Sequence, residues 1–357
     1  DDTRPHDPWH VQKLFWAGTL ECFQRLSDVS DLERISMSDT ATLASFDDVH
    51  EQRNEFLSES LAGLGAEQKT LSCKYFYDER GSDLFQKICD LPEYYVTRTE
   101  IKLLRDISGE IADVIGPGCE MIEYGTGSSE KMRIVLDALK EPAAFIAVDI
   151  SREHLLQVTE SLAADRPDLT VHAVCADFTQ PFDLPARTGG GNHVAFFPGS
   201  SLGNFTHEGA VGFMAGIAET VGPGGGLLIG IDLKKDVAIL EAAYDDSQGV
   251  TAAFNMNLLV RLNTEFGADF DLDGFRHKAL YNEEIGRIEM HLTSLKEQTV
   301  TLDGKTFKFS EGENIHTENS YKYGVEEFQA LAGRAGFTPI KVWTDADNLF
   351  SIHYLTA

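Results

Sequence analysis

The 357-residue sequence is poor in cysteine and has no paired cysteine motif. Five cysteines are scattered along it without a C-x-x-C pair: Cys22, Cys73, Cys89, Cys119 and Cys175. This pattern argues against a disulfide framework and a cysteine zinc site, and it predicts reduced thiols in a cytoplasmic protein. Only His6 and His10 have H-x-x-x-H spacing, and Pro8 between them disfavours a helix that would bring them onto one face. We therefore expect no metal.

Positive charge and long apolar runs are also scarce. The formal net charge of −28 argues against nucleic acid or an anionic membrane surface as a partner, while a cationic ligand would be tolerated. No run approaches the roughly 18 apolar residues of a membrane span, and no signal peptide is recognisable. The length and the 42 % of apolar residues allow one large domain or two intertwined ones.

Residues 1–50 are expected to form an N-terminal extension. The segment beginning at Met37 looks like a natural start. Residues 1–36 are then either an upstream, non-native extension or a genuine packing arm, and the residues alone leave both interpretations open.

The segment Met121–Lys131 lacks the third glycine of the dinucleotide-binding fingerprint. A short apolar run leads into a Glu-x-Gly-x-Gly turn, and a helix follows from Met132. Small residues let the backbone approach a ligand closely, and a helix start offers unpaired N–H groups. Glu123 at the end of the strand suits an S-adenosylmethionine site better than a pyrophosphate site. Taken alone, the segment fits a plain strand–helix turn equally well.

A regular alternation of strands and helices surrounds this turn. Apolar strands are predicted at 120–124, 143–149, 170–176, 193–197 and 225–232, and a closing antiparallel pair at 339–343 and 350–354. Such strands between helices indicate a parallel sheet covered on both faces, with ligands at the carboxyl ends of the strands. Four polar residues fall at or just beyond those ends: Glu123, Asp149, Asp177 and Asn204.

Residues 233–320 interrupt the sheet. Helices are expected at 238–244 and 256–265, and a hairpin joins 299–302 to 306–309 across Asp303-Gly304. Upstream, a helix is expected from Asp47 to Gly65. Four tyrosines lie within 21 residues, and from the residues alone packing of a loop against the core is favoured over a binding role: Tyr75, Tyr77, Tyr94 and Tyr95.

Several long motifs in fixed order carry a resemblance to a known family. They are Tyr75–Ser82, Leu91–Tyr95, Thr97–Glu100, Gly125–Ser129, Phe197–Asn204, Ala243–Asp246, Gly249–Asn255, Arg287–Met290 and Thr317–Lys322. Through these motifs the chain from about Glu51 to Ala357 resembles the S-adenosylmethionine-dependent histidine Nα-methyltransferases of ergothioneine biosynthesis. It departs from the family pattern at Tyr124, where a leucine would be expected.

The resemblance implies a fold, a reaction and a substrate. The fold is α/β, a class I (Rossmann-like) methyltransferase with a seven-stranded sheet and a second, smaller α+β domain. Residues 51–100 and 235–320 would form the substrate-binding domain, and 101–234 with 321–357 the methyltransferase domain. S-adenosylmethionine would methylate the α-amino group of L-histidine three times to give trimethylhistidine (hercynine). We expect a monomer.

The resemblance also assigns roles to individual residues. Positions matching the cofactor site are Gly125, Lys131, Asp149, Asp177, Phe178 and Gly199. Positions matching those that bind the carboxylate of the substrate are Tyr94, Asn204 and Tyr244. Tyr94 fits the family pattern better than its neighbour Tyr95. Glu318 and Ser320 match the pair that binds the imidazole, Met290 matches a pocket wall, and Tyr77 matches a tyrosine beside the reacting amine.

Two other functions compete with this one. The same fold could methylate another amino acid, such as tryptophan or an indole derivative, although Met290, Glu318 and Ser320 favour an imidazole. The chain could also be a non-catalytic module that binds S-adenosylmethionine. Separate titrations with S-adenosylmethionine and histidine would distinguish the module from the enzyme.

Overall fold

The computed structural model describes residues 43–48, 52–127 and 129–357. The predictions about residues 1–36, Cys22 and the His6/His10 pair lie outside these ranges. Residues 41–357 cluster into one compact unit, so the proposed division into two domains stays a prediction. Within the described ranges, no helix combines the length and the apolarity needed to cross a bilayer. None of the four cysteines in these ranges forms a disulfide bond.

The unit is organised around an eight-stranded sheet with the order β1-β4-β3-β2-β5-β6-β13-β12. Its strands are β1 (Ser45–Asp48), β2 (Glu120–Tyr124), β3 (Ala144–Asp149), β4 (Thr170–Cys175), β5 (His193–Phe197), β6 (Gly226–Asp232), β12 (Thr338–Thr344) and β13 (Phe350–Thr356). The strands from β1 to β6 run parallel, and β13 pairs antiparallel with β6 and β12. The predicted α/β class and the antiparallel close are confirmed.

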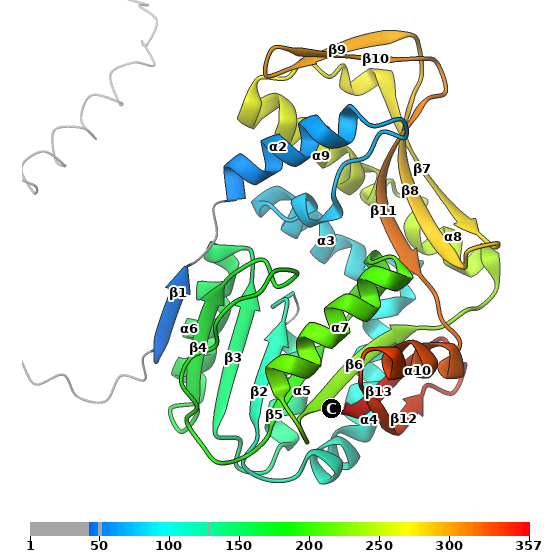
Figure 1. The fold of residues 1–357 in the computed structure, drawn as a ribbon. Helices are drawn as coiled ribbons and strands as arrows, with labels where there is room; N and C mark the ends of the chain where they lie inside the picture. The colour runs from blue at the N-terminus through cyan, green and yellow to red at the C-terminus, as the bar shows by residue number, and fades with distance from the viewer. Residues whose placement is uncertain (1–42, 49–51, 128) are drawn as a thin grey trace, which may run out of the picture. The chain divides into compact units, whose positions relative to one another are not determined.

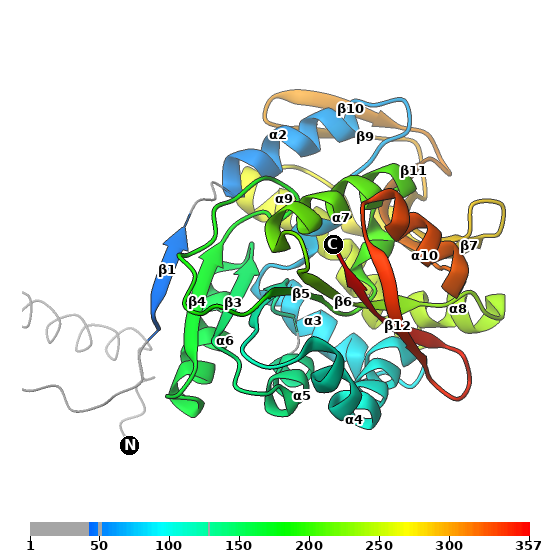
Figure 2. The ribbon, with the colours of Figure 1, turned by 60° about the horizontal axis from the view of Figure 1, so that its bottom comes forward.

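Helices cover both faces of this sheet because the strands are apolar on both sides. Successive residues of one strand enter different clusters: Met121 and Phe145 pack in one, Ile122 and Ile146 in the other. One face is covered by α4 (Tyr95–Ile115), α5 (Ser129–Ala138) and α6 (Arg152–Asp165). The other is covered by α7 (His207–Val221) and α10 (Val325–Arg334), as Figure 2 shows.

The eighth strand corrects two expectations. Seven strands were predicted, and a helix was expected to begin at Asp47. Instead Ser45–Asp48 forms β1, which pairs in parallel with β4 from Ser45↔His172 to Asp48↔Cys175. The helix, α2, spans Gln52–Leu64. A four-residue strand has too little periodicity to be recognised, and the free edge of β4 provides its partner.

A second group of elements lies above the carboxyl ends of the parallel strands (Figure 1). It contains α2, α3 (Glu79–Cys89), α8 (Val237–Tyr244), α9 (Val250–Phe266) and the short helices η2 (Cys73–Phe76) and η4 (Leu272–Gly274). A three-stranded antiparallel sheet, β11-β8-β7, combines β7 (Phe275–Asn282), β8 (Arg287–Ser294) and β11 (Asn314–Tyr321). The predicted hairpin is formed by β9 (Gln298–Leu302) and β10 (Lys305–Phe309).

Helix α9 begins six residues earlier than the predicted Met256, because a carboxylate caps it. Asp246 accepts hydrogen bonds from the backbone N–H groups of Gln248 (3.0 Å), Val250 (3.0 Å) and Thr251 (2.7 Å). The N–H groups in the first turn of a helix have no partner within the helix, so the Asp246 carboxylate stabilises the first turn of α9. The Asp246 motif therefore serves helix initiation.

Candidate active site

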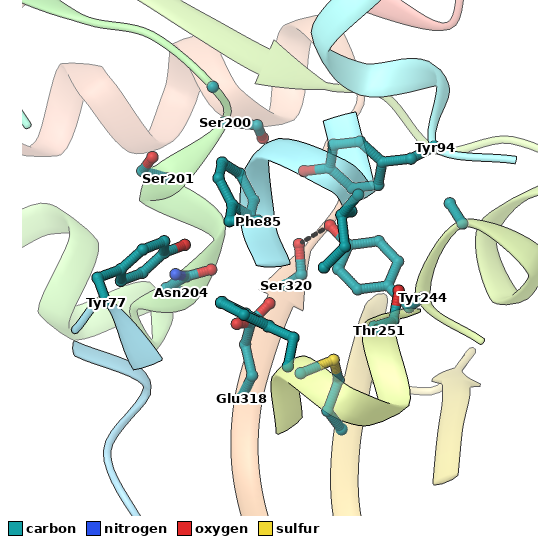
Figure 3. A pocket seen from close by; sticks show the side chains of 15 residues that line it. Tyr77, Phe85, Tyr94, Ser200, Ser201, Asn204, Tyr244, Thr251, Glu318 and Ser320 are labelled. Carbon is teal, nitrogen blue, oxygen red and sulfur yellow. Dashed lines mark hydrogen bonds between the residues drawn. The ribbon is translucent and has the colours of Figure 1, made fainter. Parts of the chain in front are cut away.

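Side chains from both groups of elements surround one cavity beyond the carboxyl end of β5. It is lined by all seven residues predicted for the substrate and the reacting amine, together with Gly199: Tyr77, Tyr94, Asn204, Tyr244, Met290, Glu318 and Ser320. Figure 3 shows Glu318 and Ser320 rising from β11, with Tyr77 and Asn204 on one side and Tyr94 and Tyr244 on the other. The roles assigned to these residues stay predictions, but the fold brings them together.

The turn after β5 brings Asn204 to this cavity. Residues Ser201–Asn204 form the short helix η3, which lies against β11. A Cβ atom at Gly203 would stand 2.8 Å from the carbonyl oxygen of Tyr321, so only glycine permits this approach. Asn204 and the β11 side chains consequently line the same cavity.

A β-bulge in β11 puts Glu318 into the cavity. Met290 pairs with Glu318, and His291 pairs with His316, so the register shifts by one residue at Thr317. Adjacent strand residues point to opposite faces, so Met290 and Glu318 share the cavity face while His291 and His316 share the other. A regular strand would have placed His316 and Glu318 on the same face.

The four tyrosines divide into two functions. Tyr75 stacks on Phe56 with ring centroids 4.3 Å apart and is 4 % exposed, which is a packing role. The Tyr95 hydroxyl donates to Asp232 at 2.9 Å, and Lys235 donates to it at 2.6 Å. Tyr77 and Tyr94 line the cavity. The structure thus places Tyr94, and not its neighbour, at the candidate substrate site.

Burial sets the protonation of the cavity side chains. It raises the pKa of Glu318 to about 7, an effect opposed by the positive charge of Lys322. It also raises the pKa of the Tyr77 phenol well above its usual value, although the residue as a whole is 36 % exposed. Tyr77 borders this cavity and a second one next to Ile150 and Ser151. At neutral pH, Tyr77 is therefore a protonated hydrogen-bonding group.

The glycine turn after β2 has the predicted backbone. Gly125 has a φ of +84°, a conformation that side-chain-bearing residues rarely adopt. Asp149, at the end of β3, accepts from the N–H of Thr126 (2.7 Å) and from its hydroxyl (3.0 Å). Its other oxygen accepts from the N–H of Ser151 at 2.7 Å. The acid therefore shapes this turn as well as lying at the strand end.

The buried carboxyl of Glu123 has an oxygen without a partner. Glu123 is 1 % exposed, and its Oε1 makes no hydrogen bond. Burial raises the pKa of this carboxyl well above its usual range, nearby Asp149 adds to the shift, and Lys131 opposes it. An unpartnered buried carboxyl beside a glycine turn fits a ligand that carries positive charge, such as S-adenosylmethionine.

Lys131 and Gly199 both contact the carboxylate of Glu100, a residue that was not among the predicted site positions. The Lys131 ammonium lies 2.6 Å from Glu100 Oε2. The same carboxylate accepts the N–H of Gly199 at 2.9 Å. Glu100 therefore fixes two of the predicted cofactor positions relative to each other.

Asp177 and Phe178 follow β4. Asp177 accepts from the Lys74 ammonium at 3.2 Å and from Thr179. The Phe178 ring lies over the glycine turn, since a Cβ atom at Gly125 would stand 3.7 Å from it. Tyr124, the departure from the family pattern, packs edge-on against Phe178 with centroids 6.1 Å apart. The Tyr124 ring, in place of the expected leucine, thus adds an aromatic contact beside this turn.

Three potential metal ligands gather on the other face of the small sheet. One ligand atom from each of Glu289, His291 and His316 lies within 4.8 Å of the others. The Glu289 carboxylate already accepts from Arg287 at 2.7 Å and contacts His291 at 3.2 Å. A second cation would have to compete with Arg287, so the expectation of no metal stays our prediction.

Removal of metal ions is accordingly expected to leave the activity unchanged. Dialysis against EDTA should alter the rate of methyl transfer by less than about twofold, because no cavity side chain belongs to the trio and its carboxylate is charge-balanced. The rate would be measured before and after dialysis, with added Zn²⁺ as the control. A loss of activity restored by Zn²⁺ would contradict the prediction.

Comparison with known proteins identifies the family. Residues 56–357 match the family model described as histidine-specific methyltransferase, SAM-dependent. A histidine N-alpha-methyltransferase of Mycolicibacterium smegmatis is 40 % identical over 296 residues, covering 82 % of this chain and 91 % of that protein. Ergothioneine biosynthesis protein 1 of Neurospora crassa is 32 % identical, covering 78 % of this chain and 32 % of that protein.

A more distant relative has a different substrate in its name. The 4-dimethylallyltryptophan N-methyltransferase of Arthroderma benhamiae is 26 % identical, covering 79 % of this chain and 88 % of that protein. The match to the family model spans nearly all of the described residues, and the Mycolicibacterium relative is aligned over most of its length. This chain therefore belongs to the S-adenosylmethionine-dependent, histidine-specific methyltransferases.

Proposed function

We propose that the protein transfers methyl groups from S-adenosylmethionine to the α-amino group of L-histidine, three times, giving trimethylhistidine for ergothioneine biosynthesis. The observation that carries this proposal is the placement of Glu318 and Ser320 together in the cavity, beside Met290. A carboxylate can accept one imidazole N–H while a hydroxyl serves the other ring nitrogen. A site built on such hydrogen bonds discriminates strongly against side chains that lack them.

The carboxylate of the amino acid has neutral partners in the same cavity. Tyr94, Asn204 and Tyr244 offer O–H and N–H groups and line the cavity with Glu318. Burial raises the pKa of both Tyr94 and Tyr244, so both phenols remain protonated donors at neutral pH. Holding the substrate at both ends would orient its amine towards the glycine turn.

S-adenosylmethionine, when bound, supplies an electrophilic methyl group on a sulfonium. Before each transfer the ammonium form of the substrate would lose one proton to water, and the freed lone pair would then form the N–C bond while the S–C bond breaks and its electron pair stays with sulfur. The contribution of the protein is alignment, which can supply a large part of the acceleration. Tyr77 would orient the amine as a hydrogen-bonding partner, because its raised phenol pKa makes it a poor base at neutral pH.

The direct test is incubation with L-histidine and S-adenosylmethionine, with products read by mass spectrometry. Mono-, di- and finally trimethylhistidine are expected in sequence, with trimethylhistidine accumulating at long times. A product that stops at one methyl group would refute the triple transfer. Turnover of tryptophan but not histidine would favour the rival substrate, and binding of S-adenosylmethionine without turnover of either would favour a non-catalytic module.

Other parts of the proposal rest on composition. The excess of acidic residues supports a small-molecule enzyme without a nucleic-acid partner. We still expect a monomer in the cytoplasm. Light scattering of the purified protein would measure its oligomeric state.

A further inference from the structure

Lys322 is a buried lysine directly behind the candidate imidazole site. It follows β11, is 1 % exposed, and does not line the cavity itself. Its ammonium group donates to Asp232 Oδ2 at 2.7 Å, to Ser320 Oγ at 2.8 Å and to Tyr244 Oη at 2.9 Å. An ammonium has three protons and accepts nothing, so these three partners use all of them.

Lys322 stays charged in this position. Burial acts to lower its pKa, but the carboxylate of Asp232 more than offsets that effect and holds the pKa above the usual value. A second lysine, Lys235, binds the other oxygen of Asp232. Two lysines therefore share one carboxylate, and Lys322 is the one whose ammonium also contacts Ser320 and Tyr244.

The contacts fix how the two hydroxyl groups can be used. Ser320 Oγ and Tyr244 Oη each accept one proton from Lys322, and they lie 2.8 Å from each other (Figure 3). One of the two hydroxyl protons occupies the bond between them. The pair can therefore donate a single proton to a ligand, and the remaining oxygen can only accept.

We propose that Lys322 is a positioning residue for imidazole recognition: it holds the hydroxyls of Ser320 and Tyr244 in this one-donor arrangement and provides the positive charge that keeps Glu318 an acceptor. The inference rests on the proposed function and deepens it. Lys322 would act on the substrate only through Ser320, Tyr244 and Glu318, without touching it.

The surroundings of Glu318 make this effect measurable. The ionisable side chains that interact with it are Cys73, Tyr77, Tyr94, Tyr244 and Lys322. Burial raises the pKa of the thiol and of the three phenols, so these are neutral near pH 7. Within the described part of the chain, Lys322 is the charged group that shifts the pKa of Glu318, and it lowers it.

The test compares the wild type with Lys322→Met and Lys235→Met. Calorimetry would measure the affinity for trimethylhistidine against pH in the presence of S-adenosylhomocysteine. The quaternary amine of trimethylhistidine has no proton to titrate, and its imidazole, with a pKa of about 6.5, titrates alike with all three proteins, so the comparison between their midpoints reports on Glu318. In the wild type, affinity should fall as the pH drops through about 7, where Glu318 becomes protonated. In Lys322→Met the midpoint should move to higher pH, because the pKa of Glu318 is no longer held down, and affinity at pH 7 should fall roughly tenfold or more.

Lys235→Met is the matched control, because it removes the other lysine on Asp232 but has no contact with Ser320 or Tyr244. Its midpoint should equal that of the wild type. Asp232 keeps Lys235 and Tyr95 as partners in Lys322→Met, so this variant does not leave an isolated buried charge. An unshifted midpoint in Lys322→Met would overturn the inference.

A further variant covers the case in which Lys322→Met does not fold. Ser320→Ala keeps the lysine charge but removes one hydroxyl of the pair. It should bind trimethylhistidine roughly tenfold more weakly with an unchanged midpoint, and wild-type affinity would overturn the inference. If the wild type binds no trimethylhistidine and does not turn over histidine, the proposed function itself fails, which is a distinguishable result.

Discussion

Replacing Glu318 by alanine is expected to lower kcat/KM for histidine by roughly 100-fold or more, with the affinity for S-adenosylmethionine changed by less than about twofold. The loss of one partner of a buried, charge-assisted hydrogen bond costs about 2–5 kcal/mol, and the imidazole N–H would be left without an acceptor. Steady-state kinetics with histidine and calorimetry with S-adenosylmethionine would measure the two effects separately.

Glu289→Ala is the matched control for this variant. Glu289 neighbours Met290 on β8, but it lies on the opposite face and pairs with Arg287. Its removal should leave kcat/KM within about threefold of the wild type, because Glu289 is as little exposed as a core-facing residue, with 12 % of its side chain accessible, but does not line the cavity. An unchanged kcat/KM in Glu318→Ala would remove the assignment of Glu318 to the imidazole.

The second large effect is expected for Glu123→Gln, which should weaken S-adenosylmethionine binding roughly tenfold or more. The unpartnered Oε1 of Glu123 is buried beside the glycine turn, where a cationic ligand would favour its ionised form. Ligand binding should therefore release a proton from the wild type but not from the variant. Calorimetry in buffers of different ionisation enthalpy would detect the difference, and equal proton release in both proteins would contradict it.

The same substitution should alter the stability of the ligand-free protein. The pKa of Glu123 is raised in the folded state, so the folded protein holds this proton more tightly than the unfolded chain. Stability then declines as the pH rises above the ordinary carboxyl pKa of about 4.3, and a glutamine avoids that decline. Thermal unfolding should show Glu123→Gln gaining stability relative to the wild type between pH 5 and pH 8. A difference that does not vary with pH would contradict the linkage.

Glu120→Gln, at the other end of β2, is the control for both measurements. Glu120 is equally buried, but its carboxylate accepts from the backbone N–H groups of Thr188 (3.1 Å) and Gly189 (2.8 Å). A glutamine there should destabilise the protein without weakening S-adenosylmethionine binding, because the lost acceptor is structural. The two variants on β2 would thus distinguish a carboxyl that binds a ligand, at Glu123, from one that binds backbone N–H groups, at Glu120.

Much of the fold followed from local patterns in the sequence. The apolar strands of the large sheet were predicted to within about two residues of their observed bounds. Such segments are recognisable because burial on both faces of a parallel sheet requires nearly continuous apolar residues. The starts of α2 and α9 were misplaced where a short strand at a sheet edge or a capping carboxylate decided the boundary.

The candidate site divides in the same way. Its seven cavity residues were assigned from motifs, and the structure places them around one cavity. The family motifs separated Tyr77 and Tyr94 from Tyr75 and Tyr95, whereas residue type alone did not, because all four stand in similar polar surroundings. The burial of Lys322 could not be predicted from the sequence. A lysine is normally solvated, and the burial of this one depends on Asp232, 90 positions away.

The sequence by itself determined the class of sheet, the glycine turn with its strand-end acids, and the set of residues available for recognition. These features depend on neighbouring residues, whose spacing the chain carries directly. Only the tertiary structure decided that a bulge at Thr317 turns Glu318 into the cavity, and that Lys322 stands behind Ser320. Both outcomes depend on the pairing of β11 with β8 and on the distant Asp232, which are long-range contacts that no local pattern specifies.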